Sequence, residues 1–406
     1  MEVRSGYKQT ELGVIPEDWD IKSLQEGIKL LSGHHVLAQH CNTKGKGTPY
    51  ITGPADFPDG IIENSKFTER PTTICRKDDI LVTVKGSGAG TIVLADDEYC
   101  ISRQLMAVRV TEWDTAYVHE CLRRGASLFG VAATGLIPGL SQGDILNKRI
   151  PLPPFLEQRA IATALSNVDA LLAKLDRLIT KKRDLKQGAL QQLLTGKIRL
   201  PGFSGAWEVR RMNSLGNTYG GLSGKTKIDF GHGCARYIPF MNVMTGTVID
   251  VEWLEVVNVS SNEVQNLTQK GDLFFNGSSE TPEEVGFCSV LLQDAHSLYL
   301  NSFCFGFRFN PDAKVNGLFF AYWFRSRKGR ETMAVLAQGA TRYNIAKSAF
   351  LRLELPQPSE GEQTAIATVL SDMDAELAVL EARRAKTRAL KQGMMQELLT
   401  GRIRLV

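Results

Sequence analysis

Residues 157–200 read EQRAIATALSNVDALLAKLDRLITKKRDLKQGALQQLLTGKIRL, and residues 362–405 read EQTAIATVLSDMDAELAVLEARRAKTRALKQGMMQELLTGRIRL. The two stretches lie 205 positions apart and are identical at 27 of 44 positions without a gap. Self-similarity over so long a period is typical of a duplicated structural unit. We therefore interpret the chain as a tandem duplication.

Each copy carries a narrow apolar stripe whose members step by four and three residues, as on the contact side of a paired helix. The stripe consists of Ile161, Leu165, Val168, Leu172, Leu175 and Ile179 in the first copy and of Ile366, Leu370, Met373, Leu377 and Leu380 in the second. Such a stripe does not stabilise a lone helix in water. We predict that the two helices pair within one chain as an antiparallel coiled coil with approximate twofold symmetry. Pairing with another subunit is the alternative.

The first copy predicts a helix over residues 157–194, about 57 Å long at 1.5 Å per residue. Thr195-Gly196 and Thr400-Gly401 are predicted to end the two helices. A proline-rich segment precedes each helix and forces extended chain there.

Trp19 and Trp207 stand at matching places near the start of two globular segments, and we interpret them as structural anchors. The distance from Trp19 to Glu157 is 138 positions and that from Trp207 to Glu362 is 155, so the second segment is 17 residues longer. Both segments contain strand-like runs and short helices in the same order, which predicts one mixed α/β (α+β) fold used twice. The predicted boundaries are residues 1–154, 155–200, 201–358 and 359–406.

The composition of the 406 residues is that of an ordinary globular protein, with 43% hydrophobic residues and a formal net charge of +4. The chain contains no apolar run long enough for a membrane span, so we expect a cytoplasmic protein. The seven cysteines are scattered, which favours free thiols over disulfides or a zinc site.

Two segments resemble catalytic motifs but lack a feature that the chemistry requires. The glycine-rich run Gly86 to Gly90 is followed by a strand-like segment, so it predicts a hairpin turn rather than a phosphate loop. Leu152-Pro153-Pro154-Phe155 is similar to the tetrapeptide with which adenine methyltransferases bind the target amine, but Leu152 occupies the position of the required Asn or Asp. We therefore predict no catalytic residue, no metal site and no enzyme activity.

The doubled pattern of Pro-x-Pro, Glu-Gln-x-Ala-Ile-Ala and Leu-Leu-Thr-Gly-x-Ile-Arg-Leu resembles the specificity subunits of type I restriction-modification enzymes over essentially the whole chain. The residues that carry this resemblance are Pro151, Pro153, Glu157, Gln158, Ala160, Ile161, Ala162 and their counterparts Pro356, Pro358, Glu362, Gln363, Ala365, Ile366, Ala367, with Ile15, Pro16 and Trp19.

The resemblance implies that each globular segment is a target-recognition domain that reads one half of a bipartite site in double-stranded DNA. It implies that the helices set the spacing and dock two methyltransferase (modification) subunits, and that restriction/translocase subunits can join the complex. S-adenosylmethionine, ATP and magnesium would bind those partners, and no membrane would be involved. The rival interpretation is a coiled-coil scaffold whose domains bind protein or glycan.

Polar and basic loop residues are the candidates for DNA contact, because phosphates need Lys or Arg and base edges favour Arg, Asn, Gln, Ser and Thr. The segment 133–142 takes the place of 339–347 in the second half. The candidates are Lys44, Lys46, Lys85, Ser87, Arg103, Gln104, Thr134, Ser141 and Gln142 in the first domain and Lys225, Lys227, Arg236, Asn276, Ser278, Thr341, Arg342, Tyr343, Asn344 and Lys347 in the second. We expect Arg342→Ala to weaken DNA binding.

Two basic clusters fall in matching parts of the predicted helices. They comprise Lys181, Lys182, Arg183 and Lys186 in the first helix and Arg383, Arg384, Lys386, Arg388 and Lys391 in the second. A solvated helix face is one interpretation, and contact with DNA phosphates or with methyltransferase subunits is the other.

Overall fold

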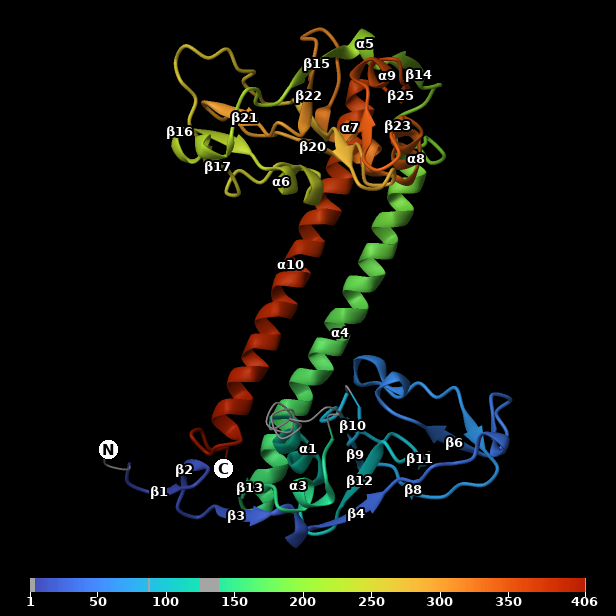
Figure 1. Cartoon of the computed structure of the whole chain (residues 1–406), viewed down its shortest axis with the longest axis vertical. Helices are drawn as coiled ribbons and strands as arrows, with labels where there is room; N and C mark the ends of the chain where they lie inside the picture. The colour runs from blue at the N-terminus through green and yellow to red at the C-terminus, as the bar shows by residue number, and fades with distance from the viewer. Residues whose placement is uncertain (1–3, 87, 125–138, 406) are drawn as a thin grey trace. The chain divides into compact units, whose positions relative to one another are not determined.

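The computed structural model describes residues 4–86, 88–124 and 139–405 (Figure 1). The chain forms two compact units, the first comprising Met1–Asp176 and Ala382–Val406 and the second Arg177–Glu381. Each unit therefore contains one globular domain and one part of each long helix.

The two long helices are α4 (Phe155–Leu193) and α10 (Glu360–Leu398), each of 39 residues. At 1.5 Å per residue each is about 58 Å long, which agrees with the predicted helix. Gly196 and Gly401 follow the helices with φ of +67° and +69°, the left-handed conformation that ends a helix and that glycine adopts without strain. The predicted helix ends are thus confirmed.

The helices run antiparallel in both units. In the first unit Lys391 of α10 binds Asp169 of α4 at 2.5 Å and Arg384 binds Asp176 at 3.1 Å. In the second unit Lys182 of α4 lies 2.7 Å from Glu376. Partner numbers fall along α10 as they rise along α4, so the intramolecular antiparallel pairing is confirmed, whereas supercoiling of the helices stays a prediction.

The apolar stripe serves two kinds of contact. Leu175, Ile179 and Leu377 are buried along the helix pair. Ile161 and Leu165 instead belong to the core of the first domain, where they meet Leu398 and Leu399 from the end of α10. Ile366 and Leu370 of the second stripe likewise belong to the core of the second domain. The first turns of each stripe therefore attach a helix to its domain, which the heptad spacing alone did not predict.

A buried glutamate fixes the start of each long helix. Glu157 accepts hydrogen bonds from Trp19 Nε1 at 3.0 Å and from Arg404 Nε at 2.7 Å. In the second unit Glu362 accepts from Trp207 Nε1 at 3.1 Å and from Arg199 Nη2 at 2.6 Å. The two tryptophans are the predicted structural anchors. The Glu of each repeat is held by the Arg that closes the other repeat.

The first domain contains a four-stranded sheet in the order β10-β9-β12-β4 and a five-stranded sheet in the order β5-β7-β6-β11-β8. The strands of the first sheet are β4 (Ile28–Ser32), β9 (Ile80–Thr83), β10 (Ile92–Leu94) and β12 (Leu105–Val110). Those of the second are β5 (Cys41–Asn42), β6 (Thr48–Ile51), β7 (Phe67–Thr68), β8 (Ile74–Cys75) and β11 (Tyr99–Ile101). The other strands and α-helices of the described part of this domain are β1 (Tyr7–Thr10), β2 (Gly13–Pro16), β3 (Asp20–Ser23), β13 (Arg149–Leu152), α1 (Thr115–Arg124) and α3 (Gln142–Leu146).

The second domain contains a four-stranded sheet in the order β15-β22-β18-β20 and a three-stranded sheet in the order β17-β16-β21. Their strands are β15 (Gly216–Gly220), β16 (Phe230–Ile238), β17 (Glu255–Val257), β18 (Leu273–Asn276), β20 (Cys288–Val290), β21 (Leu298–Leu300) and β22 (Cys304–Phe309). The other strands are β14 (Glu208–Arg211), β19 (Ser278–Ser279), β23 (Ala337–Gln338), β24 (Tyr343–Ile345) and β25 (Glu354–Gln357). The helices are α5 (Met212–Leu215), α6 (Phe240–Thr245), α7 (Gly317–Arg325), α8 (Arg327–Val335) and α9 (Lys347–Leu351).

The two domains have the same fold, as predicted. The order β10-β9-β12-β4 of the first domain corresponds to β20-β18-β22-β15 of the second, and the parallel pair β6–β11 corresponds to β16–β21. The glycine-rich run joins the antiparallel strands β9 and β10, and Gly90 N–H donates to the Thr83 carbonyl at 2.8 Å, so this run is the predicted hairpin connection.

All seven cysteines are free thiols, as predicted. No helix in the part of the chain that the structure describes is both long and apolar enough to cross a membrane.

Candidate nucleic-acid interface

Three chain segments meet at the end of strand β18 in the second domain. Gly277 N–H donates to the Phe303 carbonyl at 2.9 Å, and Ile345 N–H donates to the Gly277 carbonyl at 3.1 Å. Ser278 pairs with Asn344 in the ladder of β19 and β24. The predicted recognition loop is therefore fixed against the segment after β18 and the residue before β22.

The first domain repeats this arrangement with other side chains. Val84 N–H donates to the Gln104 carbonyl, and Leu140 N–H donates to the Val84 carbonyl, both at 2.8 Å. Lys85 and Gly139 form a bridge that corresponds to Ser278 and Asn344. The predicted equivalence of the two loops is thus confirmed for residues 139–142. Thr134 and Ser87 lie outside the described residues.

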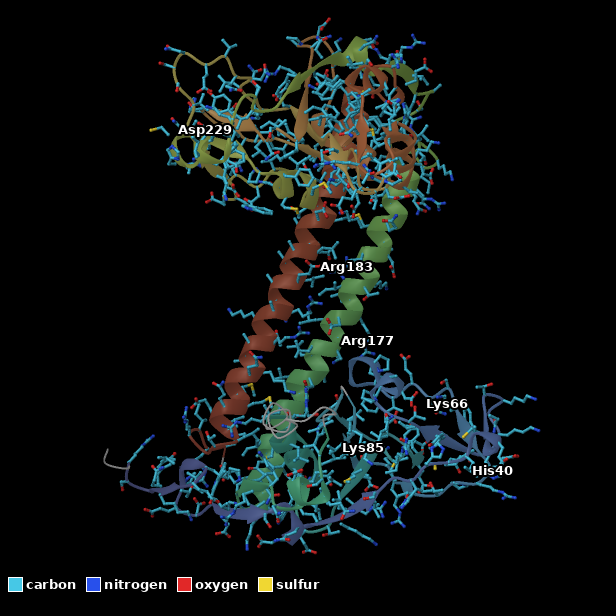
Figure 2. All side chains as sticks on the ribbon, viewed as in Figure 1. His40, Lys66, Lys85, Arg177, Arg183 and Asp229 are labelled. Atoms are coloured by element: carbon cyan, nitrogen blue, oxygen red, sulfur yellow. The ribbon has the colours of Figure 1, made fainter. Side chains whose placement is uncertain are left out.

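We call these two places the reading edges. The first reading edge comprises residues 84–85, 103–104 and 139–142, and the second comprises residues 277–278, 302–303 and 339–345. In the first, Lys85, Arg103, Gln104, Ser141 and Gln142 are exposed, and Figure 2 labels Lys85.

Two of these exposed side chains also have structural partners. Ser141 caps α3 by accepting a hydrogen bond from Asp144 N–H at 3.2 Å. Gln142 Nε2 donates to Ser32 Oγ at 2.9 Å. Ser141 and Gln142 therefore help to fix the loop that carries them.

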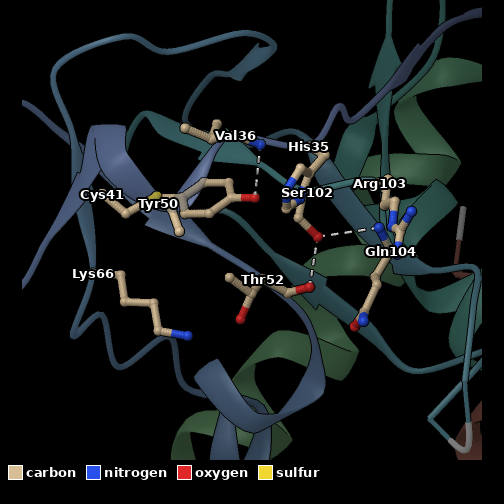
Figure 3. A pocket seen from close by; sticks show the side chains of 10 residues that line it. His35, Val36, Cys41, Tyr50, Thr52, Lys66, Ser102, Arg103 and Gln104 are labelled. Carbon is tan, nitrogen blue, oxygen red and sulfur yellow. Dashed lines mark hydrogen bonds between the residues drawn. The ribbon is translucent and has the colours of Figure 1, made fainter.

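A pocket of about 400 Å³ adjoins the first reading edge (Figure 3). Ser102 Oγ donates to the Thr52 carbonyl at 2.6 Å and accepts from Gln104 N–H at 3.1 Å, which fixes the chain at the pocket wall. Burial raises the pKa of Tyr50, so its hydroxyl stays neutral. Arg103 and Gln104 were predicted from the sequence. The sequence did not predict the other residues that line the pocket, because they come from separate segments of the chain. They are His35, Val36, Ala38, Cys41, Tyr50, Thr52, Lys66 and Ser102.

Lys44 and Lys46 lie in the turn between β5 and β6. Asn42 Oδ1 accepts hydrogen bonds from the backbone N–H groups of both lysines, at 3.0 and 3.1 Å, and both residues are exposed. Such an Asx-type turn holds the backbone while the two ammonium groups reach solvent. Their positions are therefore compatible with phosphate contact.

Three predicted contacts of the second domain prove to be buried. Asn276 is fully buried, where its amide donates to the Glu284 carbonyl at 2.8 Å and accepts from Phe287 N–H at 2.6 Å. Ser278 is also buried, and the Lys225 side chain is only 5% exposed in an ion pair with Glu263. That pair lowers the pKa of Glu263 to about 2. Asn276 and Lys225 are engaged with partners inside the protein, and Ser278 is buried. Contrary to the prediction from the sequence, these three side chains are not exposed for contact with DNA.

The other candidates of the second domain are accessible. Tyr343 is half-buried, and the exposed residues are Lys227, Arg236, Thr341, Arg342, Asn344 and Lys347. The Arg342 guanidinium lies 5.5 Å from the ring centroid of Phe303. Phe303 is 54% exposed and was missed from the sequence, because a phenylalanine beside a strand is ordinarily a core residue.

The basic clusters of the long helices contact the opposite helix. Lys186 and Arg183, the latter labelled in Figure 2, form ion pairs with Asp374 and Glu381, and Lys182 pairs with Glu376. Arg384 and Lys391 are likewise paired, whereas Lys181, Arg383, Lys386 and Arg388 remain exposed. The paired members of the clusters therefore hold the helices together, and only the exposed ones fit the sequence-based interpretations.

The family model described as type I restriction modification DNA specificity domain matches residues 16–182 and 207–387, once for each half. The chain is 24% identical over 411 residues to the type I restriction enzyme MjaVIII specificity subunit of Methanocaldococcus jannaschii, covering 96% of this chain and 94% of that protein. It is 28% identical over 201 residues to the MjaX specificity subunit of the same organism, where the match spans 47% of that protein.

Solved structures share the fold. The type I restriction-modification system S subunit from M. genitalium superposes with a TM-score of 0.62 at 16% identity, covering 98% of both chains. A chain from a study of complex assembly and conformational transition of the type I system superposes with a TM-score of 0.55 at 14% identity, covering 96% of this chain and 99% of that one.

Proposed function

Because the chain belongs to the family of type I restriction modification DNA specificity domains, we propose that its two globular domains each read one half of a two-part target in double-stranded DNA. The chain provides the DNA sequence specificity of a type I restriction-modification system. Family membership disfavours the scaffold interpretation, in which the domains would bind protein or glycan.

The observation that carries the proposal is the pair of equivalent reading edges with different side chains. The exposed Lys85 and Gln104 of the first edge correspond to the buried Ser278 and the exposed Phe303 of the second, so the first edge offers side-chain donors at two positions where the second offers none. A shared backbone frame with exchanged side chains suits two readers of different base sequences, since base edges are distinguished by side-chain donors and acceptors. We expect the two half-sites to differ, so that the target is asymmetric.

Phosphate contacts are expected from exposed lysines and arginines of the two domains, and they would position the domains without reading sequence. Lys44, Lys46 and Lys66 in the first domain and Lys227, Arg236 and Lys347 in the second supply such charges. Because counterion release dominates affinity, we expect binding to weaken steeply as salt rises.

We assign the chain no chemistry of its own. The paired helices would set the gap between half-sites and dock two methyltransferase subunits, which restriction/translocase subunits can join. S-adenosylmethionine, ATP and magnesium would bind to those partner subunits. The sequence supports this division, because Leu152 replaces the Asn or Asp that an adenine methyltransferase needs to hold its target amine. Since the substrate is the DNA of the cell, we place the complex in the cytoplasm.

The test is co-expression of the chain with a type I methyltransferase subunit from the same genome, followed by mapping of methylated adenines across the host genome. We expect a two-part motif with a fixed gap of unspecified bases, absent when the chain is deleted. Methylation that does not depend on this chain, or a stable complex without any methylated motif, would refute the proposal.

A further inference from the structure

Phe303 is an exposed aromatic residue at the start of a buried strand. Phe303 is 54% exposed, whereas Phe305 and Phe307 in the strand β22 that follows it are at most 2% exposed. Leaving a large apolar side chain in water forgoes the burial that stabilises its neighbours. Phe303 therefore adds little to the core, and its contact with the recognition loop is the one to explain.

That contact is with Arg342, whose guanidinium lies 5.5 Å from the centre of the Phe303 ring, within the range of a cation–π interaction. Among the described residues, no hydrogen bond or ion pair to the Arg342 side chain is found. Arg308 and Arg325 of the same domain, by contrast, are engaged with Asp272 and with backbone carbonyls. The donors of Arg342 thus stay free for a ligand, while the aromatic ring holds the group in place.

Both partners stand on a fixed backbone. Phe303 N–H donates to Asn301 Oδ1 at 2.8 Å, and its carbonyl accepts from Gly277 N–H. The Arg342 carbonyl accepts from Asn344 Nδ2 at 3.2 Å. Gly339 lies beside that carbonyl with φ of +136°, and a Cβ there would stand 2.1 Å from the oxygen, so only glycine fits. A side chain held on a rigid frame loses little entropy on binding.

The first domain shows what this position does when no aromatic residue occupies it. There Gln104 takes the place of Phe303, and a Cβ on Gly53 would stand 2.5 Å from its Oε1, so the missing side chain of Gly53 makes room for the Gln104 amide. An amide can itself pair with a base edge, whereas a benzene ring carries no donor or acceptor. The ring of Phe303 makes no hydrogen bond to a base, and the side chain beside it that can do so is that of Arg342.

We propose that Phe303 is a positioning residue for base readout by the second domain: its ring orients the Arg342 guanidinium for bidentate donation to O6 and N7 of a guanine in the major groove. The guanidinium is planar and presents parallel donors that match these two acceptors. This inference rests on the proposed function. It assigns the base contact to Arg342, identifies the base as guanine, and identifies Phe303 as the residue that orients Arg342.

The test compares methylation motifs of the complete complex carrying wild-type chain, Phe303→Tyr, Phe303→Leu, Phe303→Ala or Arg342→Ala. Arg342→Ala should lower the preference for one guanine of the second-domain half-site by about ten-fold or more. Phe303→Ala and Phe303→Leu should lower it at the same position by about two- to five-fold, and Phe303→Tyr should keep it, because only tyrosine retains the π-face. The half-site read by the first domain serves as the internal control.

An equal loss at all positions, or a loss restored by leucine as well as by tyrosine, would show that Phe303 has only a structural role and would overturn the inference. So would a motif unchanged in Phe303→Ala, or one changed at a position that Arg342→Ala leaves intact. Recovery of each variant chain with the methyltransferase subunits checks folding. If the wild-type chain itself directs no two-part motif, the proposed function fails, which is a different outcome.

Discussion

Arg342 is exposed, unpaired with any described carboxylate, and held at the second reading edge. We expect Arg342→Ala to weaken binding of the specific target by about 1–3 kcal/mol, because a bidentate contact to a base is lost. The measurement is DNA affinity of the complete complex at physiological salt. Arg327→Ala is the matched control, since Arg327 is an exposed arginine of the same domain that pairs with Glu331 on its own helix. Equal affinity of wild type and Arg342→Ala would remove Arg342 from the interface.

His119 gives the first unit a pH-dependent stability. Burial, together with the charges of Arg123 and Lys391, lowers the pKa of His119 from 6.5 to about 4, although Asp169 opposes them. The folded state thus binds fewer protons than the unfolded state between these values, so this contribution is complete above pH 6.5 and is lost as pH falls toward 4.

We expect His119→Gln to abolish that contribution. The wild type should lose about 2 kcal/mol more unfolding free energy than the variant between pH 7 and pH 5, as measured by urea unfolding at both values. If wild type and His119→Gln lost the same unfolding free energy between pH 7 and pH 5, His119 would take up its proton as readily in the folded state as in the unfolded state.

Residue type predicted the interface only in part. Lys44, Lys46, Arg103, Gln104 and Arg342 are exposed, as polar loop residues usually are. Asn276 and Lys225 were predicted to contact DNA but are buried in the protein. Polar groups inside a loop need hydrogen-bond or charged partners, and the sequence does not show which polar side chains serve as those partners. Phe303 was missed for the opposite reason, since its chemistry is that of a core residue.

At the scale of elements, the junction at Glu157 links Trp19, the start of α4 and the last residues of the chain. Glu157 is fully buried, and Arg404 is its charged partner. Removing one partner of a buried ion pair leaves an uncompensated charge. We expect Arg404→Ala to destabilise the first unit by about 3 kcal/mol in urea unfolding.

Arg402→Ala is the control for that variant, because Arg402 is 66% exposed and only 3.4 Å from Glu397 at its closest, a pair of the kind that contributes little. Arg199→Ala should have the same effect on the second unit as Arg404→Ala has on the first, since Arg199 binds Glu362 there. If Arg404→Ala were as stable as Arg402→Ala, Trp19 alone would satisfy Glu157.

The helices were the most predictable elements, because a repeat and a four-three spacing determine their extent, partner and ends. The strands of the two domains could be expected to match in order, but their pairing could not be derived, since contacts between distant segments leave no local pattern. Ile161 and Leu165 lie in the core of the first domain rather than between the helices. The apolar stripe thus predicts that a residue is buried, but it does not predict which element the residue packs against.

For the whole molecule, the duplication means that the same junction is built twice. Trp19 and Glu157 bound the first domain as Trp207 and Glu362 bound the second, with an arginine of the other repeat on each glutamate. Asp169 and Lys391 likewise repeat as Asp374 and Lys186. The sequence contained this correspondence, whereas the bases that each domain reads depend on loop geometry that composition does not determine.

Interchangeable junctions lead to a prediction for a chain in which Trp207–Glu362 is replaced by a second copy of Trp19–Glu157. The graft should fold, because its ends supply the same anchors, and Glu120 would arrive where Tyr322 now lies beside Lys186, a match of opposite charges. From the predicted approximate twofold symmetry of the duplicated halves, we expect two identical domains to read an inverted repeat of the first half-site. Adenine mapping with the methyltransferase subunits is the measurement, and the reciprocal graft, with two second domains, is the control that should give the other half-site inverted. An asymmetric motif from either graft would mean that a half-site is read by more than the domain itself.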